Sequence, residues 1–254
     1  MREWDKEQGA VSLRISAGTA KNPKTGEWVQ LDLPFGPKPR LILAHLNNRG
    51  TQEESPEIDV EKSLTGFVKR IQKFSPNGHQ IRAYKEQLSR ISVATIRIAM
   101  TTKDRTFQMN SHIVSAFDLL IKDEQQRVLW PSEIRLSLDY FTRLQNHAVP
   151  LDERALAGLA HSTIALDIYA WLAQRLHWVP RGKPQFIAWA ALKEQFGGGL
   201  GQMNNFKRKF RIALGQVLAF YSRAHVTGDG RGLTLYNSPP PIAKKRFPVH
   251  NHPE

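Results

Sequence analysis

The side chains best suited to chemistry in this chain are polar and basic groups gathered between residues 204 and 236. They are Asn205, Lys207, Arg208 and Arg211, with Arg231 following at a distance. Cations near the start of a helix suit the phosphates of a polyanion, because the helix dipole and the free N–H groups there also favour negative charge. Arginine can in addition pair with the edge of a guanine through two hydrogen bonds.

A single amphipathic helix would hold most of these groups. Apolar residues recur at steps of three and four, which places them on one stripe of a helix that can pack inward. That stripe comprises Phe206, Phe210, Ala213, Leu214, Val217 and Tyr221. The same spacing turns Lys207, Arg208 and Arg211 outward, and Asn204 or Asn205 is expected to cap the first free N–H groups.

A hairpin is expected directly after this helix. Residues 224–227 and 233–236 read AHVT and LTLY, and the glycine-rich segment between them allows the positive φ angles of a tight turn. Arg231 would then lie at the tip. A basic helix followed by a hairpin with arginine at its tip is the order of a winged helix, whose helix enters the major groove while the wing touches the flanking backbone. The alternative is a solvated surface helix beside an ordinary hairpin. We expect binding to double-stranded DNA.

Composition agrees with a polyanionic partner and excludes several classes of protein. The 254 residues include 36 Lys and Arg against 23 Asp and Glu, a net charge of +13, which attracts nucleic acids, ribosomes or membrane surfaces alike. The absence of cysteine excludes disulfides, cysteine-ligated zinc, iron–sulfur clusters and a thiol nucleophile. No apolar run approaches the roughly 20 residues that cross a bilayer, and the first residues lack a signal peptide's apolar core. A cytoplasmic location without a membrane partner is therefore expected.

The first half of the chain repeats the pattern of helix and hairpin. Helices are expected near residues 41–47 and 63–74, followed by a helix whose apolar stripe is Ile81, Tyr84, Leu88 and Ile91. Arg82, Lys85 and Arg90 lie away from that stripe and are the second set of candidate DNA-binding residues. Two strands, at residues 94–102 and 105–114, follow with a charged turn between them. The expected fold class is α+β with two tandem winged-helix domains.

Domain boundaries follow from breaks in these patterns. Residues 1–27 show no sustained period and are expected to form a flexible arm before a first domain at 28–146. Polar residues and proline at 146–150 separate it from a second domain at 147–240, in which residues 151–160, 162–179 and 186–196 are expected to be helical. Residues 241–254, rich in proline and charge, are expected to be disordered.

Several sequence blocks resemble one known family. The segments PFGPKPRLILAHL, QLSRISVATI, VPLDERALAGLA, STIALDIYAWLAQRL and FKRKFRIALGQVL, in this order between Trp28 and Ser238, resemble the plasmid-encoded replication initiators (RepA-type) of Gram-negative bacteria. The resemblance implies two winged-helix domains, binding of repeated origin sequences (iterons), opening of an AT-rich segment, and recruitment of the host initiator and replicative helicase. It carries no residue-by-residue contact motif, and it leaves both a monomer and a homodimer open as the active form.

Other candidate sites in the chain fit their chemistry less well. His250 and His252 resemble the metal-binding histidine pair of nicking initiators, in which a bulky apolar residue separates the two histidines. Here the residue between them is the polar Asn251 and the pair lies between prolines, which argues against a metal site. The glycine-rich segment 197–201 lacks the Gly-Lys-Ser/Thr ending of a nucleotide loop, so it is interpreted as a turn. No catalytic set stands out, so neither enzymatic activity nor a cofactor is expected. The main alternative function is a winged-helix transcription regulator without replication activity.

Overall fold

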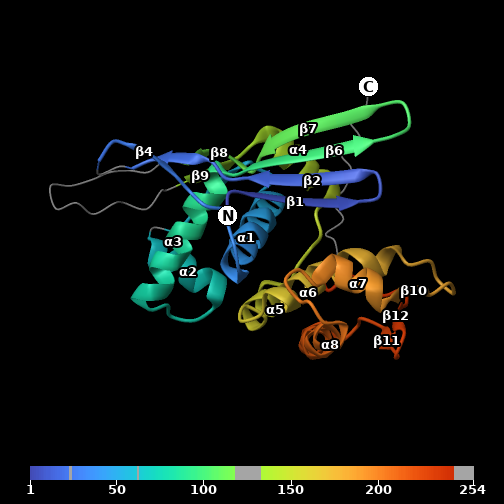
Figure 1. Ribbon diagram of the computed structural model, residues 1–254. Coiled ribbons are helices and arrows are strands. Elements are labelled where there is room, and N and C mark those ends of the chain that lie inside the picture. Colours follow the sequence, from blue (N-terminus) through green and yellow to red (C-terminus); the bar gives the residue numbers. More distant parts are fainter. Residues whose placement is uncertain (23–24, 62, 118–132, 243–254) are drawn as a thin grey trace, which may run out of the picture. The chain divides into compact units, whose positions relative to one another are not determined.

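The computed structural model describes residues 1–22, 25–61, 63–117 and 133–242 (Figure 1). The chain divides into two compact units, Met1–Ala148 and Val149–Glu254. This division lies within the segment 146–150, where the sequence places its domain boundary. Residues 243–254, which make up most of the tail expected to be disordered and include the His250–His252 pair, lie outside the described residues. Both units combine helices with small antiparallel sheets, so the chain is an α+β protein.

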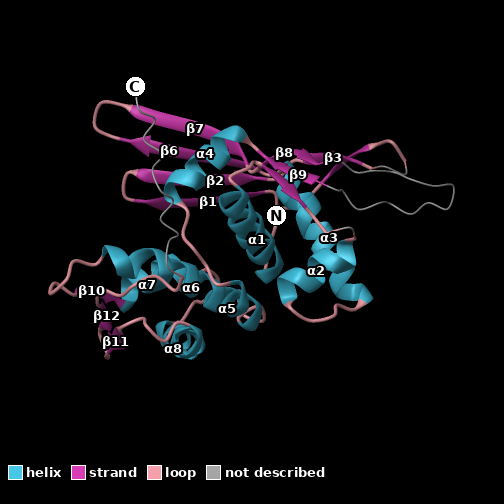
Figure 2. Cartoon of the chain, turned by 180° about the vertical axis from the view of Figure 1, so that it is seen from behind, coloured by secondary structure: helices cyan, strands magenta, loops and turns pink. Residues whose placement is uncertain are grey.

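The helical core of the first unit consists of α1 (Pro37–Glu53), α2 (Leu64–Gln72) and α3 (Gly78–Val93) (Figure 2). Capping defines where α2 and α3 begin: the Ser63 side chain accepts from the Gly66 N–H, and Asn77 and Gln80 form a reciprocal capping box. In α3, Tyr84, Leu88 and Ile91 are buried, as the expected stripe requires. Burial raises the pKa of Tyr84 to about 12.

Helix α1 is longer than expected. The sequence suggests a stop between Asn47 and Gly50, whereas the helix continues to Glu53. Gly50 is buried, and a Cβ placed there would lie 3.3 Å from the Leu136 side chain. Packing against a neighbouring strand therefore outweighs the weak helix propensity of glycine at this position.

The first 21 residues are not a flexible arm, which corrects the expectation for residues 1–27. β1 (Glu3–Gln8) and β2 (Val11–Ser16) form a hairpin, and β3 (Thr19–Lys21) pairs with β4 (Trp28–Gln30). The hairpin belongs to a four-stranded antiparallel sheet of order β1-β2-β6-β7, with β6 (Thr95–Thr101) and β7 (Thr106–His112). Leu13 lies opposite Ile98 and Ile15 opposite Ile96, so the arm is ordered by strands that are far away in sequence.

This pairing also changes the assignment of the first wing. The β6–β7 hairpin was expected to be the wing after α3, but it belongs to the four-stranded sheet. A separate sheet, of order β5-β9-β8, contains β5 (Glu57–Asp59), β8 (Val114–Phe117) and β9 (Glu133–Leu136). The segment between β8 and β9, residues 118–132, lies outside the described residues. Helix α4 (Leu138–His147) closes the unit.

The second unit begins with three helical segments, namely α5 (Glu153–Gly158), α6 (Thr163–Arg175) and the 3-10 helix η1 (Leu176–Trp178). β10 (Gln185–Ala188), α7 (Trp189–Phe196) and α8 (Met203–Phe220) follow, then β11 (Val226–Gly228) and β12 (Gly232–Leu235). Residues 186–196 were expected to form one helix, yet Phe186 and Ile187 pair with β12. A short apolar run can form either a helix or a strand, and here the pairing with β12 makes its first residues a strand.

The two units share an order of elements. When the β6–β7 hairpin, which lies between α3 and β8 along the chain, and η1, which follows α6, are left out, each runs helix, strand, helix, helix and then two strands. The two series are α1-β5-α2-α3-β8-β9 and α6-β10-α7-α8-β11-β12. In each of these sheets the strand that comes last along the chain lies in the middle, giving β5-β9-β8 and β10-β12-β11. The two units therefore share a repeated topology, but the strands predicted for the first repeat, β6 and β7, are not part of it.

Candidate nucleic-acid interface

The basic helix α8 is anchored by the stripe that the sequence predicts. All of its members are buried, from Phe206, Phe210 and Val217 at 0% exposure to Leu214 at 9%. The rings of Trp189 and Phe196 from α7 pack edge-on against Phe210, at centroid distances of 5.7 and 5.6 Å. This aromatic cluster fixes the rotation of α8, and therefore decides which side chains face outward.

The start of α8 differs from the expectation. The helix begins at Met203 with Gln202 as N-cap and no side-chain cap, so neither Asn204 nor Asn205 caps it. The Phe206 N–H already donates to the Gln202 carbonyl at 3.1 Å, which draws both asparagines into the first turn. Asn205 instead accepts a 3.1 Å hydrogen bond from Arg208 Nη2.

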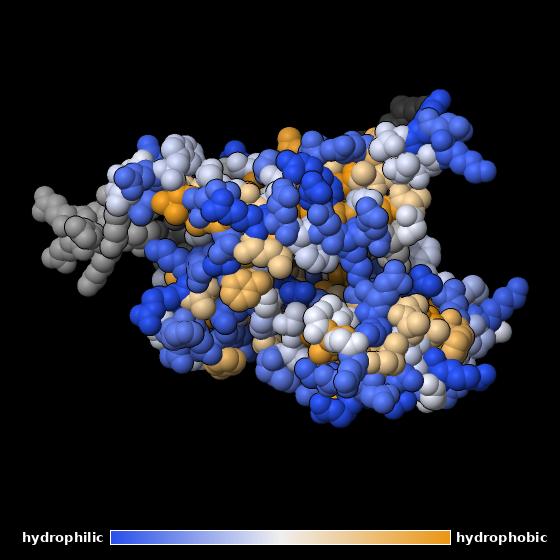
Figure 3. All heavy atoms as spheres, viewed as in Figure 1, coloured by the Kyte–Doolittle hydropathy of each residue, from blue (hydrophilic) through white to orange (hydrophobic). Residues whose placement is uncertain are grey.

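The outward face of α8 carries Asn204, Arg208, Lys209 and Ile212, which are exposed, and Asn205, which is partly exposed. Ile212 is 56% exposed and is the apolar member of this otherwise polar face. Lys209 and Ile212 were not among the predicted site residues. Each follows a predicted residue by four positions, Asn205 and Arg208 respectively, so the helical period places them on the same face. Figure 3 shows how polar residues cover most of the drawn surface, with apolar residues scattered among them.

The hairpin turn between β11 and β12 carries Arg231, and Asp229 organises it. The Asp229 carboxylate accepts the backbone N–H groups of Arg231 and Gly232 at 2.7 and 2.9 Å. These bonds, that of Gly232 first, together with the nearby Arg231 guanidinium, lower the pKa of Asp229 below its ordinary value of 3.8. The Arg231 side chain is 86% exposed and lies 3.4 Å from the same carboxylate. The turn thus presents a guanidinium group to solvent.

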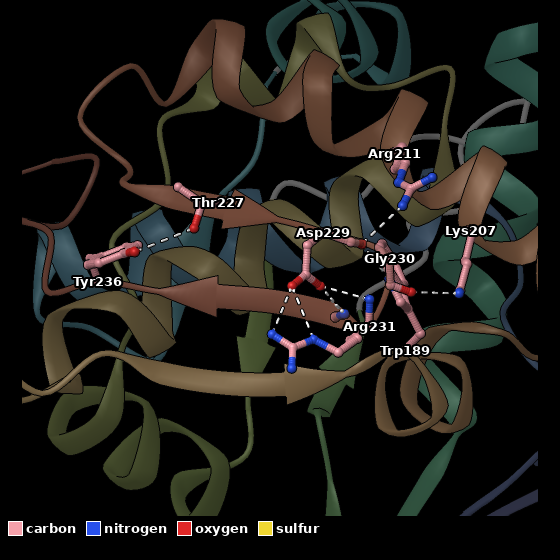
Figure 4. A network of polar contacts seen from close by, with 9 residues as sticks. Trp189, Lys207, Arg211, Thr227, Asp229, Gly230, Arg231 and Tyr236 are labelled. Atoms are coloured by element: carbon pink, nitrogen blue, oxygen red, sulfur yellow. Dashed lines mark hydrogen bonds and ion pairs between the residues drawn. The ribbon is translucent and has the colours of Figure 1, made fainter.

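Lys207 and Arg211 contact this turn (Figure 4). Lys207 Nζ donates to the Gly230 carbonyl at 3.0 Å, and Arg211 Nη2 donates to the Asp229 carbonyl at 3.1 Å. Both cations also lie over the Trp189 ring, at 5.7 and 5.1 Å from its centroid. The set predicted as one basic face is therefore divided, since Lys207 and Arg211 face the hairpin while Arg208 bonds within its own helix.

In the first unit, Arg82, Lys85 and Arg90 line one shallow hollow on α3 together with Gln30, Asp32 and Glu86. Arg82 is exposed and Lys85 partly exposed. Arg90 is different, because its side chain is only 13% exposed. Its guanidinium donates to the Leu33 carbonyl at 3.0 Å, lies 5.0 Å from the Phe35 ring centroid and pairs with Glu86. These contacts join α3 to the segment before α1 and favour a structural role for Arg90.

Within the described ranges, no group of three or more His, Cys, Asp or Glu side chains is arranged to hold a metal ion. Among those same residues, no helix has both the length and the apolar character needed to cross a bilayer.

Fold and surface together define an α+β protein built from two units of like topology, one of which presents a basic helix beside an arginine-bearing turn. The chain belongs to the family of plasmid-encoded RepA proteins, because the family model described as "Plasmid encoded RepA protein" matches residues 33–191. This is a family of plasmid replication initiators. The match covers most of the first unit and the second as far as α7, and it ends before α8.

Two solved structures share the fold over most of their length. A crystal structure of RctB domains 2–3 has a TM-score of 0.56 at 7% identity, covering 92% of this chain and 90% of that one. A selenomethionine crystal structure of RctB domains 2 and 3 has a TM-score of 0.60 at 6% identity, covering 93% and 90%. A comparison with curated proteins found no match.

Proposed function

We propose that this chain is a plasmid replication initiator that binds repeated origin DNA (iterons) in a sequence-specific manner, promotes origin opening and recruits host replication proteins. The observation that carries the proposal is the exposed face of α8 beside a hairpin turn that presents Arg231. Membership of the RepA family supports the link to replication. The net charge of +13 supports a polyanionic partner. The chain would act by binding, without catalysis and without a cofactor.

Both units would be winged-helix modules. In the second, α7 and α8 form the helix pair, α8 enters the major groove, and the turn at Asp229–Gly232 is the wing tip. In the first, α2 and α3 form the corresponding pair. The shared order of elements and the shared order of strands in the sheets support this assignment. The two wing strands of the first module would then be β8 and β9 rather than β6 and β7.

Within the second module, the contacts divide by geometry. Asn205, Arg208, Lys209 and Ile212 would face the base edges or the groove walls, because they occupy the outward side of α8. Arg231 would contact the backbone beside the groove. In the first module, Arg82 and Lys85 would supply phosphate contacts from α3, while Arg90 would stabilise the module from within.

A homodimer through the four-stranded sheet is the self-association that we propose. Strand pairing places Val11, Met100 and Phe107 on one face, on which Trp4 also lies. The exposures of these four side chains are 41, 46, 61 and 40% respectively. Strands β1 and β7 form the edges of the sheet. An exposed apolar face that packs against its own copy would form a two-fold dimer, and replacing Phe107 with Glu should shift that dimer to a monomer in analytical ultracentrifugation.

Origin dependence tests the replication function. A circular DNA carrying this gene and its flanking sequence, without another origin, should replicate in a suitable host and stop replicating when Arg208 is replaced by Ala. The second candidate, a transcription regulator, is favoured by the same exposed face of α8. It would bind the flanking DNA and change expression of a reporter gene, but it would not support replication. Binding without replication across suitable hosts would therefore reject the initiator.

A further inference from the structure

We propose that Lys207 and Arg211 are positioning residues, which hold the wing tip against α8 so that Arg231 is presented at a fixed place beside the groove. This inference rests on the proposed DNA-binding function of the second unit. It changes the role of two residues that the basic helix alone would assign to DNA. The cations left for direct contact from α8 are then Arg208 and Lys209, with Arg231 contributing from the turn.

The contacts converge on three consecutive carbonyls of the turn. The Asp229 carbonyl accepts from both Trp189 Nε1 and Arg211 Nη2, each at 3.1 Å, which uses both of its lone pairs. The Gly230 carbonyl accepts from Lys207 Nζ at 3.0 Å, and the Arg231 carbonyl accepts from the Trp189 backbone N–H at 3.0 Å. Donors from α7 and α8 therefore bind the whole tip of the wing.

Trp189 connects this latch, formed by Trp189, Lys207 and Arg211, to the core. Its side chain is 3% exposed and packs edge-on against Phe206 and Phe210. The outer side of the ring receives both cations, an arrangement in which the ring quadrupole attracts positive charge. Because Trp189 itself is buried, it has little surface with which to touch DNA, and its influence on binding would pass through the turn.

The turn needs such support. β11 and β12 contain three and four residues, and a hairpin this short is marginal without packing. Gly230 at its tip has no neighbour within 4 Å of the position where a Cβ would be, so side-chain packing does not hold it. β12 is held by its pairing with β10 and by the buried side chains of Leu233 and Leu235, and the latch adds support at the tip, where this packing ends. Its effect is to place a guanidinium group with 86% exposure at the edge of the α8 surface.

Amide exchange in the free, full-length protein tests the latch without DNA. Arg211→Ala and Lys207→Ala should each accelerate exchange in a peptide spanning residues 226–236, with α6 unchanged. Arg208→Ala is the matched control, since it removes a cation from the same helix without touching the turn, and it should leave the wing peptide as in the parent. Unchanged exchange in both latch variants would overturn the proposal.

A double-mutant cycle on DNA tests the positioning role. The probe is a duplex of about 30 base pairs, close to three helical turns, that the full-length chain selects from a random library. Arg231→Ala should weaken binding about tenfold, as expected for loss of one charge-assisted hydrogen bond. Arg211→Ala should weaken DNA binding in the parent chain. In the Arg231→Ala background the same substitution should weaken binding by less than about twofold, because Arg211 acts on DNA through the Arg231 side chain. Arg208→Ala should cost the same in both backgrounds.

Additive losses for Arg211→Ala and Arg231→Ala would overturn the positioning role and return Arg211 to direct DNA contact. Trp189→Phe gives a second measure, because it keeps an aromatic ring in the core but removes the Nε1–H donor. It should weaken binding without changing the preferred sequence, and its loss should also disappear in the Arg231→Ala background. If the parent chain selects no duplex from the library, the proposed function is rejected. Amide exchange would still decide whether the latch exists.

Discussion

Arg208 and Arg211 lie about one turn apart on α8 and carry the same charge, yet their different contacts favour different roles. Arg211 donates to the wing and lies over Trp189, whereas Arg208 is exposed and donates to Asn205 within its own helix. The guanidinium of Arg208 can therefore turn to a base edge at little cost. Specificity in this unit would concentrate on Arg208 and its neighbours.

Replacing Arg208 with Ala should cost about 1 to 3 kcal/mol of binding free energy and relax preference at one base pair, because the bidentate pairing with guanine would be removed. Arg175→Ala is the matched control, since it removes the same exposed charge from α6. Competition binding against a panel of single-base variants measures both effects. A uniform loss across the panel would assign Arg208 to phosphate contact instead.

Ile212 should contribute an apolar contact in the groove, where the thymine methyl is the apolar group that a side chain can touch. Substituting uracil for thymine removes that methyl and should weaken binding of the parent by about 0.8 kcal/mol at one position, the free energy of burying one such group. Ile212→Ala should no longer distinguish the two duplexes. Equal binding of thymine and uracil duplexes by the parent would place Ile212 away from the bases.

At the scale of elements, the strand β10 and the wing depend on glycine at one position. A Cβ at Gly232 would lie 2.2 Å from the Ile187 carbonyl oxygen, a distance that backbone atoms cannot tolerate. Gly230, two residues earlier, has open space at the same position. The β10–β12 pairing therefore requires glycine at 232 but not at 230.

Gly232→Ala should separate β12 from β10 and lower the free energy of unfolding by about 1 to 3 kcal/mol, the cost of overpacking, as measured by urea denaturation. Gly230→Ala is the control and should change the free energy of unfolding by less than about 0.5 kcal/mol. Equal stability of the two variants would show that the strands can separate without loss.

The turn between β11 and β12 should lose the hydrogen bonds of the Asp229 carboxylate at low pH. The pKa of Asp229 is lowered in the folded protein, so its contribution is present above the unfolded value and is lost as pH falls through the folded pKa, below 3.8. The N–H resonances of Arg231 and Gly232 should then titrate together below that pH. Asp229→Asn should keep an acceptor oxygen and remove the titration, while a midpoint at or above 3.8 would contradict the assigned cause.

At the scale of the whole molecule, both units should contribute to one DNA site. If α3 binds as α8 does, protection should span about two helical turns, because successive major grooves on one face lie about 34 to 36 Å apart. Replacing Arg82 and Lys85 with Ala in the full chain should shorten the hydroxyl-radical footprint at one end. It should also reduce the slope of log K against log salt by about 0.9 for each phosphate that the protein no longer neutralises.

Lys103→Ala combined with Arg105→Ala is a control of equal charge in the first unit, in the exposed turn between β6 and β7, and it should leave the footprint at its full length. An unchanged footprint and salt slope after replacement of Arg82 and Lys85 would mean that α3 does not touch DNA. The first unit would then serve self-association or binding to host proteins.

The sequence by itself determined the features that depend on nearby residues. The stripe from Phe206 to Tyr221, the outward direction of Arg208 and the turn that carries Arg231 all follow from periods of a few residues and from glycine content. The domain boundary near 146–150 and the polyanionic character of the expected partner follow from composition. These properties can be predicted without knowing which distant segments of the chain pack beside them.

The tertiary structure decided everything that depends on pairing across the chain. The β1–β2 hairpin joins a sheet because β2 pairs with β6, some 80 positions away, and Phe186 is a strand residue because β12 lies beside it. Arg90 turns inward because Leu33 and Phe35 lie against α3. Lys207 and Arg211 meet the wing because Trp189, in another helix, lies beneath both cations and bonds to the same turn. A helix period places a side chain on a face, but which atoms lie opposite that face is set by long-range packing.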